Sequence, residues 1–358
     1  MPAALDGTGP ALLPLPDGPG RDSVLAALRP DEPLERDDIA LVVPTSGSTG
    51  TPKGALLTAA ALLHSARATL DRLGGPGQWL LAMPVTHVAG LQVLVRSLVG
   101  DAPPEVLDLS HGFTADAFVA ATTRLDPGGR HYTALVPTQL RRLIDAGVDL
   151  STYDAILVGG AALTFPAPVN VVRTYGMSET CGGCVYGGQP LGGVDVEVEE
   201  GGRISIGGPV VFAGYRLRPD LTAVALVDGR HRTQDLGVWT EDGRLEVIGR
   251  VDDVIVSGGV NVPAGLIEAV LSEHPLVRAA AVVGVPDDEW GERVVAVVVG
   301  PAGAPSLELA DVRAFCAERV EAAAVPRLVI TVESLPMLPS GKPDRSAVRS
   351  LVAAHLPR

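Results

Sequence analysis

Residues 45–54 read TSGSTGTPKG and follow the short apolar run ALVVP at residues 40–44. Glycines let backbone amides approach an anion, hydroxyl groups add donors, and Lys53 adds positive charge, so the composition predicts a phosphate-binding loop. We expect it to connect a strand to a helix. The loop is not a Walker A loop, because Pro52 stands where the glycine before the lysine belongs. The Rossmann spacing G-x-G-x-x-G is missing here too.

The basic residues add a second signal, because the chain has 26 arginines and only two lysines, Lys53 and Lys342. Both lysines lie in polar segments rich in glycine and proline, TSGSTGTPKG and LPSGKPDR. A lysine is a compact point charge on a flexible stem, which arginine does not replace. We therefore expect both positions to need an ammonium group.

Length and charge limit the classes of protein that the chain can form. The 358 residues are 46% hydrophobic, enough for a sizeable core and two domains. The formal charge of -14 argues against partners such as nucleic acid or an anionic membrane. The first residues show no secretion signal, and no apolar run is long enough to span a bilayer. These features predict a cytoplasmic protein, and they leave the oligomeric state open, with a homodimer as one option.

The hydrophobic pattern predicts an α/β fold in two parts. In residues 1–251, apolar strands alternate with helical stretches, such as a helix from Thr58 to Leu73, which predicts a mainly parallel sheet flanked by helices. An antiparallel hairpin region follows from Gly192. Residues 252–358 predict a small α+β domain, with a helix after Pro263, two apolar strands, and a helix at residues 308–323.

Further polar motifs follow the loop in a fixed order. They are VGGAAL at residues 158–163, TYGMSET at 174–180, RTQDLG at 232–237, GRVDDVIVSGG at 249–259 and PSGKPDR at 339–345. With the loop, these six motifs resemble the signatures of the adenylate-forming acyl- and aryl-CoA ligases. This family also includes carrier-loading adenylation domains and beetle luciferases.

The resemblance implies an enzyme that activates a carboxylate with ATP and Mg²⁺ and then transfers the acyl group to coenzyme A. It implies catalytic roles for Lys342, Lys53 and Glu179, with Glu179 as the magnesium ligand. Asp252 would be the hinge about which a mobile small domain turns. The nucleotide would be bound by Thr45, Ser46, Gly47, Ser48, Thr49, Gly50, Gly159, Gly160, Tyr175, Gly176, Ser178, Asp235 and Arg250.

The residue types agree with these roles. An aromatic ring such as that of Tyr175 can stack on a purine, and a glutamate such as Glu179 is a hard oxygen ligand for magnesium. The carboxylate of Asp235 can accept hydrogen bonds from both ribose hydroxyls, and the guanidinium of Arg250 can donate to a ribose or phosphate. Gly258 and Gly259 would leave room for the pantetheine arm of CoA, with a plain turn as the competing interpretation.

The substrate is predicted from a closer resemblance. The chain begins only 44 residues before its loop, where most relatives have a much longer region, and in this it resembles the short o-succinylbenzoate-CoA ligases of menaquinone biosynthesis. The stretch MPVTHVAGLQVLVRSL at residues 83–98 is similar to theirs. The second carboxylate of that substrate needs a cationic or multi-donor partner. Candidate pocket residues are His87, Arg96, Thr138 and Gln139.

Other functions stay open at this stage. The chain can be a different acyl- or aryl-CoA ligase, a stand-alone carrier-loading adenylation enzyme, or a nucleotide sensor without catalysis. Cys181 and Cys184 form a C-x-x-C pair, but a zinc site needs two more ligands. We therefore expect small residues that line a pocket and not a redox or metal site.

Overall fold

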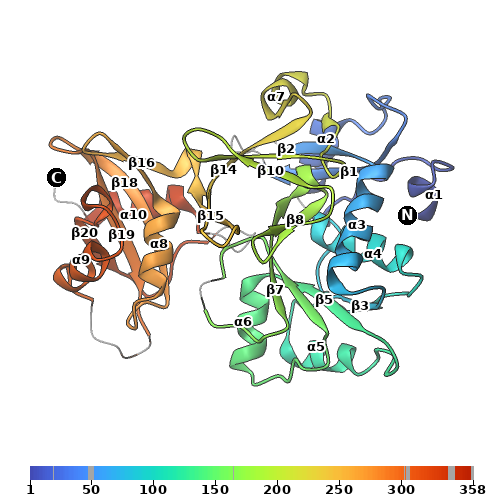
Figure 1. The fold of residues 1–358 in the computed structure, drawn as a ribbon, viewed down its shortest axis with the longest axis horizontal. Helices are drawn as coiled ribbons and strands as arrows, with labels where there is room; N and C mark the ends of the chain where they lie inside the picture. Colours follow the sequence, from blue (N-terminus) through green and yellow to red (C-terminus); the bar gives the residue numbers. More distant parts are fainter. Residues whose placement is uncertain are drawn as a thin grey trace.

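The computed structural model describes residues 1–18, 20–46, 52–163, 165–301, 303, 307–337 and 343–355. It shows a large part, which contains three sheets, and a smaller part with one sheet, joined near residue 251 (Figure 1). The predicted α/β class is confirmed. Among the described residues, no helix is both long and apolar enough to cross a membrane.

The largest sheet has seven strands in the order β4-β3-β5-β6-β7-β8-β9. Its strands from β4 to β7 are parallel, and the β7–β8 and β8–β9 pairs are antiparallel. The strands are β3 (Gln78–Leu81), β4 (Glu105–Val106), β5 (His131–Leu135), β6 (Ala155–Val158), β7 (Val171–Met177), β8 (Gly182–Tyr186) and β9 (Gln189–Pro190).

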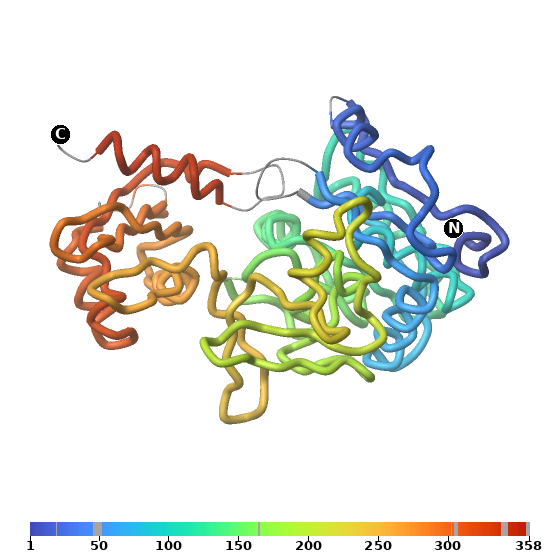
Figure 2. Tube along the Cα trace, turned by 90° about the horizontal axis from the view of Figure 1, so that it is seen from above, coloured from blue at the N-terminus to red at the C-terminus, as the bar shows by residue number. Residues whose placement is uncertain are grey.

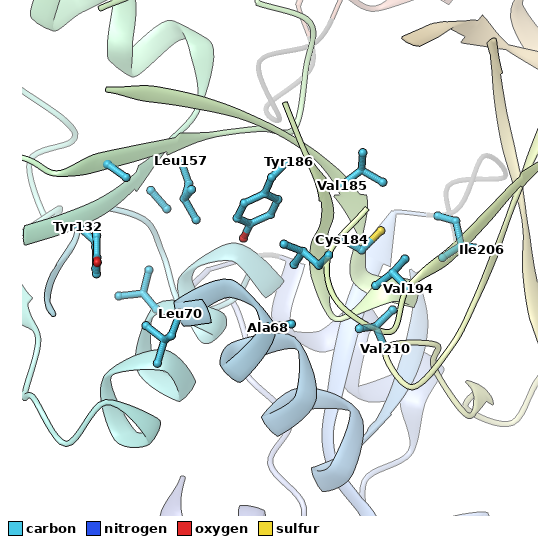
Figure 3. Packing of buried hydrophobic residues seen from close by; sticks show 14 of the residues in the cluster. Ala68, Leu70, Tyr132, Leu157, Cys184, Val185, Tyr186, Val194, Ile206 and Val210 are labelled. Atoms are coloured by element: carbon cyan, nitrogen blue, oxygen red, sulfur yellow. The ribbon is translucent and has the colours of Figure 1, made fainter. Parts of the chain in front are cut away.

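Helices cover both faces of this sheet because its strands bury side chains on both sides. The helices are α3 (Ala59–Leu73), α4 (Val88–Val99), α5 (Ala115–Thr122) and α6 (Pro137–Asp145). Trp79, Tyr132 and Leu157 pack with residues of α3 and α4 on one face, where Tyr186 and Cys184 join the same cluster (Figure 3). Leu80 and Ile156 pack with α5 and α6 on the other face.

The sequence predicted the limits of α3 well. Thr58 caps the helix, because its hydroxyl accepts a hydrogen bond of 3.1 Å from the Ala61 amide, and Gly74 ends it in the left-handed conformation. The predicted alternation of strands and helices is also confirmed, because β3, α4, β4, α5, β5, α6 and β6 follow α3 in turn.

The second sheet corrects one prediction. It has the order β1-β2-β12, with β1 (Ile39–Ser46), β2 (Pro52–Thr58) and β12 (Gly214–Tyr215), all antiparallel. The segment after the loop is therefore a strand, and the prediction that the loop leads directly into a helix was wrong. Residues 54–57 are buried between β1 and β12, and this burial stabilises an extended conformation. The segment is too short for its sequence pattern to predict a strand.

The third sheet is the predicted hairpin region. It contains β10 (Asp195–Val198), β11 (Arg203–Gly207), β13 (Leu226–Val227), β14 (Arg230–Trp239) and β15 (Leu245–Arg250), all paired antiparallel. Helix α7 (Pro219–Ala225) lies beside it, and the first residues of the chain form α1 (Pro2–Leu5) and α2 (Gly20–Leu28).

The smaller part follows a short 3-10 turn, η2 (Val251–Asp253), and appears to one side in both views (Figures 1 and 2). Its elements are β16 (Val254–Ser257), β17 (Val260–Pro263), α8 (Ala264–Ser272), β18 (Ala279–Asp287), β19 (Gly291–Val299), α9 (Leu309–Ala317), η3 (Ala322–Ala324), β20 (Leu328–Thr331) and α10 (Arg345–His355). Helix α9 ends at Ala317, earlier than the predicted helix at residues 308–323.

Candidate active site

The first part of the site is the end of the β1–β2 pair. Thr45 lies opposite Lys53 in the register of the two strands, and the Thr45 hydroxyl is 3.4 Å from the Lys53 carbonyl oxygen. Ser46 is the last residue of β1. Gly47, Ser48, Thr49 and Gly50 lie outside the described residues, so their predicted contacts stay predictions. The strand pairing nevertheless brings Thr45 and Lys53 to the same end of this sheet.

Lys53 and Glu179 both contact Tyr215. The Lys53 ammonium is 4.4 Å from the centre of the Tyr215 ring, and the Tyr215 hydroxyl donates a hydrogen bond of 2.6 Å to Oε1 of Glu179. Burial and the Glu179 carboxylate raise the pKa of Tyr215, so the hydroxyl stays protonated and remains a donor. Two predicted catalytic residues therefore meet at one tyrosine.

Sequence reasoning missed Tyr215. It lies in a two-residue strand, and its pairing with Ala55 of β2 is a contact between distant parts of the chain. The only feature of the sequence that could have drawn attention to Tyr215 is that tyrosine is rare in this chain, which has five.

A second group joins Tyr175, Asp235 and Arg250. The Tyr175 hydroxyl donates to Oδ2 of Asp235 at 2.9 Å, and Arg250 lies 3.4 Å from Oδ1 of the same carboxylate. The pairing of β14 with β15 places Asp235 opposite Arg250. Arg250 also holds the predicted hinge residue Asp252 through two hydrogen bonds of 2.8 and 3.0 Å. The structure thus connects three predicted nucleotide-binding residues to the predicted hinge.

Close packing explains the glycines of two motifs. A Cβ atom at Gly159 would lie 2.4 Å from the Thr174 hydroxyl oxygen, and one at Gly176 would lie 2.1 Å from the Gly182 carbonyl oxygen. Both distances are too short for any side chain. Ser178 starts the 3-10 turn η1 (Ser178–Thr180), which presents Glu179 directly after β7. These glycines keep the backbone open on one side of a cavity.

That cavity has a volume of about 120 Å³. Glycines from two motifs and from the C-x-x-C pair contribute to its wall, together with residues of α4. Its lining residues are Met83, Val88, Ala89, Gln92, Arg96, Ala134, Leu135, Val136, Leu157, Gly159, Gly160, Thr174, Gly176, Gly182, Gly183 and Tyr186.

Arg96 is the charged residue of this lining. It is only 3% exposed, its Nη2 donates to the Tyr186 hydroxyl at 3.2 Å, and its guanidinium carbon is 5.1 Å from the centre of the Trp79 ring. Within the described residues, Nε of Arg96 and both amide atoms of Gln92 are buried without a hydrogen-bond partner. Burial lowers the pKa of Arg96. A buried cation beside unsatisfied polar atoms suits a ligand that carries negative charge.

The other predicted pocket residues lie outside the cavity lining. His87 is exposed at the start of α4, and Thr138 is exposed on α6. The Gln139 side chain bonds the Val136 amide and the Ala82 carbonyl, each at 3.0 Å, which caps α6. A role for these three residues in substrate binding stays a prediction.

The cysteines do not form the pocket wall that we expected. Cys181 and Cys184 are both fully buried in separate hydrophobic clusters, and Cys184 is visible among its apolar neighbours in Figure 3. Burial raises the pKa of both thiols, to about 12 for Cys184. They are free thiols in apolar surroundings, which does not suit a redox or metal site. The glycines between them, Gly182 and Gly183, line the cavity instead.

The described part of the smaller domain contributes a turn and an ion-pair cluster. Gly258 and Gly259 have φ angles of 60° and 79°, so they form the tight turn between β16 and β17, and their predicted contact with CoA stays a prediction. Arg345 pairs with Asp253 at 2.8 Å and with Glu268 at 2.7 Å. Lys342 lies outside the described residues.

The donor set fits a magnesium ion that is shared with a nucleotide. Among the described residues, no group of three or more metal-ligating side chains exists. Magnesium usually takes one or two carboxylates and completes its coordination with phosphates and water. A single buried carboxylate, that of Glu179, matches that requirement, and Tyr215 links it to Lys53.

Comparison with known proteins gives the family. Residues 6–217 match the model of the AMP-binding enzyme family, and residues 266–342 match the model of the AMP-binding enzyme C-terminal domain. A probable 2-succinylbenzoate–CoA ligase from Mycobacterium tuberculosis is 46% identical over 96% of this chain and 92% of its own length. A 2-succinylbenzoate–CoA ligase from Listeria monocytogenes is 31% identical over 87% of this chain and 69% of its own length.

Solved structures show the same architecture. The o-succinylbenzoate CoA synthetase MenE from Bacillus subtilis, in complex with the acyl-adenylate OSB-AMP, has a TM-score of 0.75 and 27% identity over 88% of this chain and 70% of that chain. The amide bond synthetase McbA from Marinactinospora thermotolerans has a TM-score of 0.77 and 30% identity, with the same coverage of both chains. The chain therefore belongs to the AMP-binding enzyme family.

Proposed function

We propose that the chain is an ATP-dependent o-succinylbenzoate–CoA ligase that acts through an acyl-adenylate and releases AMP and pyrophosphate. The curated relatives at 46% and 31% identity carry the name of this activity. ATP, Mg²⁺ and coenzyme A are then the nucleotide, the metal and the acyl acceptor. One B. subtilis neighbour is a complex with ATP and magnesium ion, which supports the first two.

The observation that carries the substrate assignment is Arg96. It lines the same cavity as Gly159, Gly160 and Gly176, the glycines that we assign to the nucleotide side. o-Succinylbenzoate has two carboxylates, of which only one is activated, and the other needs a buried cation or several donors. Arg96, with Gln92 one helical turn before it, provides both. A ligase for a benzoate or a fatty acid would have no use for this buried charge.

In the proposed first step, an oxygen of the succinyl carboxylate attacks the α-phosphorus of ATP. The bond from that phosphorus to the bridging oxygen breaks, and pyrophosphate leaves with the electron pair. Lys53, and Lys342 from the smaller domain, would stabilise the charge that spreads over the phosphate oxygens. Magnesium held by Glu179 would supply further positive charge to the phosphates. Tyr175, Asp235 and Arg250 would fix the adenosine.

In the proposed second step, the CoA thiol loses its proton and its sulfur attacks the acyl carbon, so that AMP leaves as the thioester forms. We assign Asp252 as the hinge about which residues 252–358 turn between the steps, relative to residues 1–251. Gly258 and Gly259 would then lie along the path of the pantetheine arm. The close contact of Arg250 with Asp252 supports this assignment, because a change at the hinge would reach the residues around Asp235.

We also propose a cytoplasmic location, where ATP and CoA are available. The homodimer is a prediction from the sequence analysis that light scattering of the purified chain will decide. Small-molecule substrates are the partners that the family requires.

Pyrophosphate release with a panel of carboxylates tests the function. The panel contains o-succinylbenzoate, 4-oxo-4-phenylbutanoate (the same molecule without the ring carboxylate), benzoate and a medium-chain fatty acid. We expect ATP- and CoA-dependent turnover with o-succinylbenzoate and at least about 100-fold lower kcat/KM without the ring carboxylate. Equal or better turnover of benzoate or the fatty acid would refute the substrate assignment.

A further inference from the structure

Tyr215 contacts both charged groups to which the proposed function gives catalytic roles. Its hydroxyl donates to Oε1 of Glu179 at 2.6 Å, while its ring faces the ammonium of Lys53 at 4.4 Å. Tyr215 is 6% exposed and Glu179 is 8% exposed. Within the described residues, Lys53 and Glu179 form no ion pair with each other.

The surroundings hold Tyr215 and Glu179 in place. The Tyr215 amide donates to the Thr222 hydroxyl at 2.8 Å, and the Phe212 ring packs edge-on against the Tyr215 ring at 4.9 Å. The Phe212 amide in turn donates to the Glu179 carbonyl oxygen at 2.9 Å. The carboxylate and the tyrosine therefore belong to one connected set of fixed groups. Such support is what keeps a reactive group in a productive position.

We propose that Tyr215 is a positioning residue for the adenylation step. Its hydroxyl holds the Glu179 carboxylate where a magnesium ion shared with ATP would bind, and its ring keeps the Lys53 ammonium apart from that carboxylate. Without the ring, the two opposite charges would pair and neutralise each other. This inference rests on the proposed function, because the roles of Glu179 and Lys53 come from it.

Two substitutions separate the contribution of the Tyr215 hydroxyl from that of the Tyr215 ring. Tyr215→Phe removes the hydroxyl and keeps the ring, whereas Tyr215→Leu removes both. A matched control is Tyr153→Phe, because the Tyr153 hydroxyl is 2.6 Å from the Thr122 hydroxyl in the cluster on the other face of the large sheet. Each phenylalanine variant thus loses one buried tyrosine hydroxyl bond of the same length.

The first measurement is ATP binding by calorimetry, with and without Mg²⁺. For Tyr215→Phe we expect metal-free ATP affinity within about twofold of the wild type, and a gain on adding Mg²⁺ that is about tenfold smaller. The Mg²⁺ concentration for half-maximal pyrophosphate release should rise about tenfold. For Tyr215→Leu, metal-free ATP affinity should also fall, and adding Glu179→Gln should restore it because Lys53 is freed.

The outcomes distinguish this inference from the proposed function. Tyr153→Phe should leave both Mg²⁺ measurements unchanged, and a Tyr215→Phe variant that behaves in the same way overturns the positioning role. Turnover of benzoate or the fatty acid by the wild type that equals or exceeds turnover of o-succinylbenzoate refutes the substrate assignment and leaves the Tyr215 test intact. A wild-type chain that neither binds ATP nor releases pyrophosphate overturns both.

Discussion

Arg96 allows a test in which stability and activity change in opposite directions. Its charge is buried, which costs several kcal/mol. The bond to Tyr186 returns about 1.5–3 kcal/mol and the contact with the Trp79 ring up to about 2 kcal/mol. Because Nε of Arg96 is buried without a hydrogen-bond partner, these two contacts do not offset the whole cost, and Arg96 is unfavourable in the protein without substrate. We expect Arg96→Met to raise the free energy of unfolding by about 1 kcal/mol, which is roughly 1–2 °C in Tm for a chain of this length.

The same substitution should damage catalysis. If Arg96 binds the ring carboxylate, its removal leaves a buried charge on the substrate without a partner, at a cost of about 3 kcal/mol or more. The value of kcat/KM for o-succinylbenzoate should then fall on the order of 100-fold, whereas that for 4-oxo-4-phenylbutanoate should change little. Calorimetry and pyrophosphate release measure the two effects. A variant that is less stable and equally active would refute the reasoning.

Arg216 is the matched control, because it is an equally buried arginine with a full set of partners. It donates at 2.6–3.1 Å to the carbonyl oxygens of Leu28, Arg29, Glu32 and Pro33 and to the Glu35 carboxylate. Arg216→Met leaves these acceptors unsatisfied, so we expect a loss of about 3 kcal/mol or more in the free energy of unfolding. If the free energy of unfolding rises for Arg96→Met and falls for Arg216→Met, the hydrogen-bond partners of a buried arginine, and not burial alone, determine how its replacement changes stability.

Three further predictions concern Asp235, Gly176 and the buried His231. Asp235→Asn should raise KM for ATP about tenfold or more in initial-rate measurements, because the neutral amide is a weaker acceptor for a ribose; an unchanged KM would exclude the contact. Gly176→Ala should cost about 1–3 kcal/mol of stability in denaturant titrations, because the new Cβ would lie 2.1 Å from the Gly182 carbonyl oxygen, while Gly129→Ala, which has open space, should be neutral. Burial lowers the pKa of His231 below its usual 6.5, so the folded state binds fewer protons than the unfolded state and stability should fall as the pH drops below about 6.5. His231→Gln should reduce the slope of the free energy of unfolding against pH by up to about 1.4 kcal/mol per pH unit. An identical slope would contradict the role of His231 in this pH dependence.

Patterns that depend on neighbouring residues were predictable. Thr58 and Gly74 mark the two ends of α3 because capping is a local interaction, and the apolar runs of β18 and β19 identify their strands. The family resemblance likewise predicted that Tyr175, Asp235 and Arg250 bind the same nucleotide. Each of these residues lies in a strand, and its side chain forms a hydrogen bond or ion pair within this group of three.

Contacts between distant segments were not predictable. Tyr215 reaches Glu179 only because β12 adds to β2, and a two-residue strand has no recognisable period. Arg216 donates mainly to backbone carbonyl oxygens. Every residue has a backbone carbonyl, so the sequence does not indicate which residues are its partners. The strand β2 was missed for a similar reason, since its conformation depends on burial between two other strands.

The pairing of Arg345 with Asp253 and Glu268 has a mechanical consequence. Asp253 lies directly after the proposed hinge, and Arg345 starts the last helix, three positions after Lys342 in the chain. One guanidinium thus fastens the first and last segments of the smaller domain to each other. A rotation of the chain at residue 252 would therefore turn helix α10 through the same angle, as one rigid body with the segment that follows the hinge.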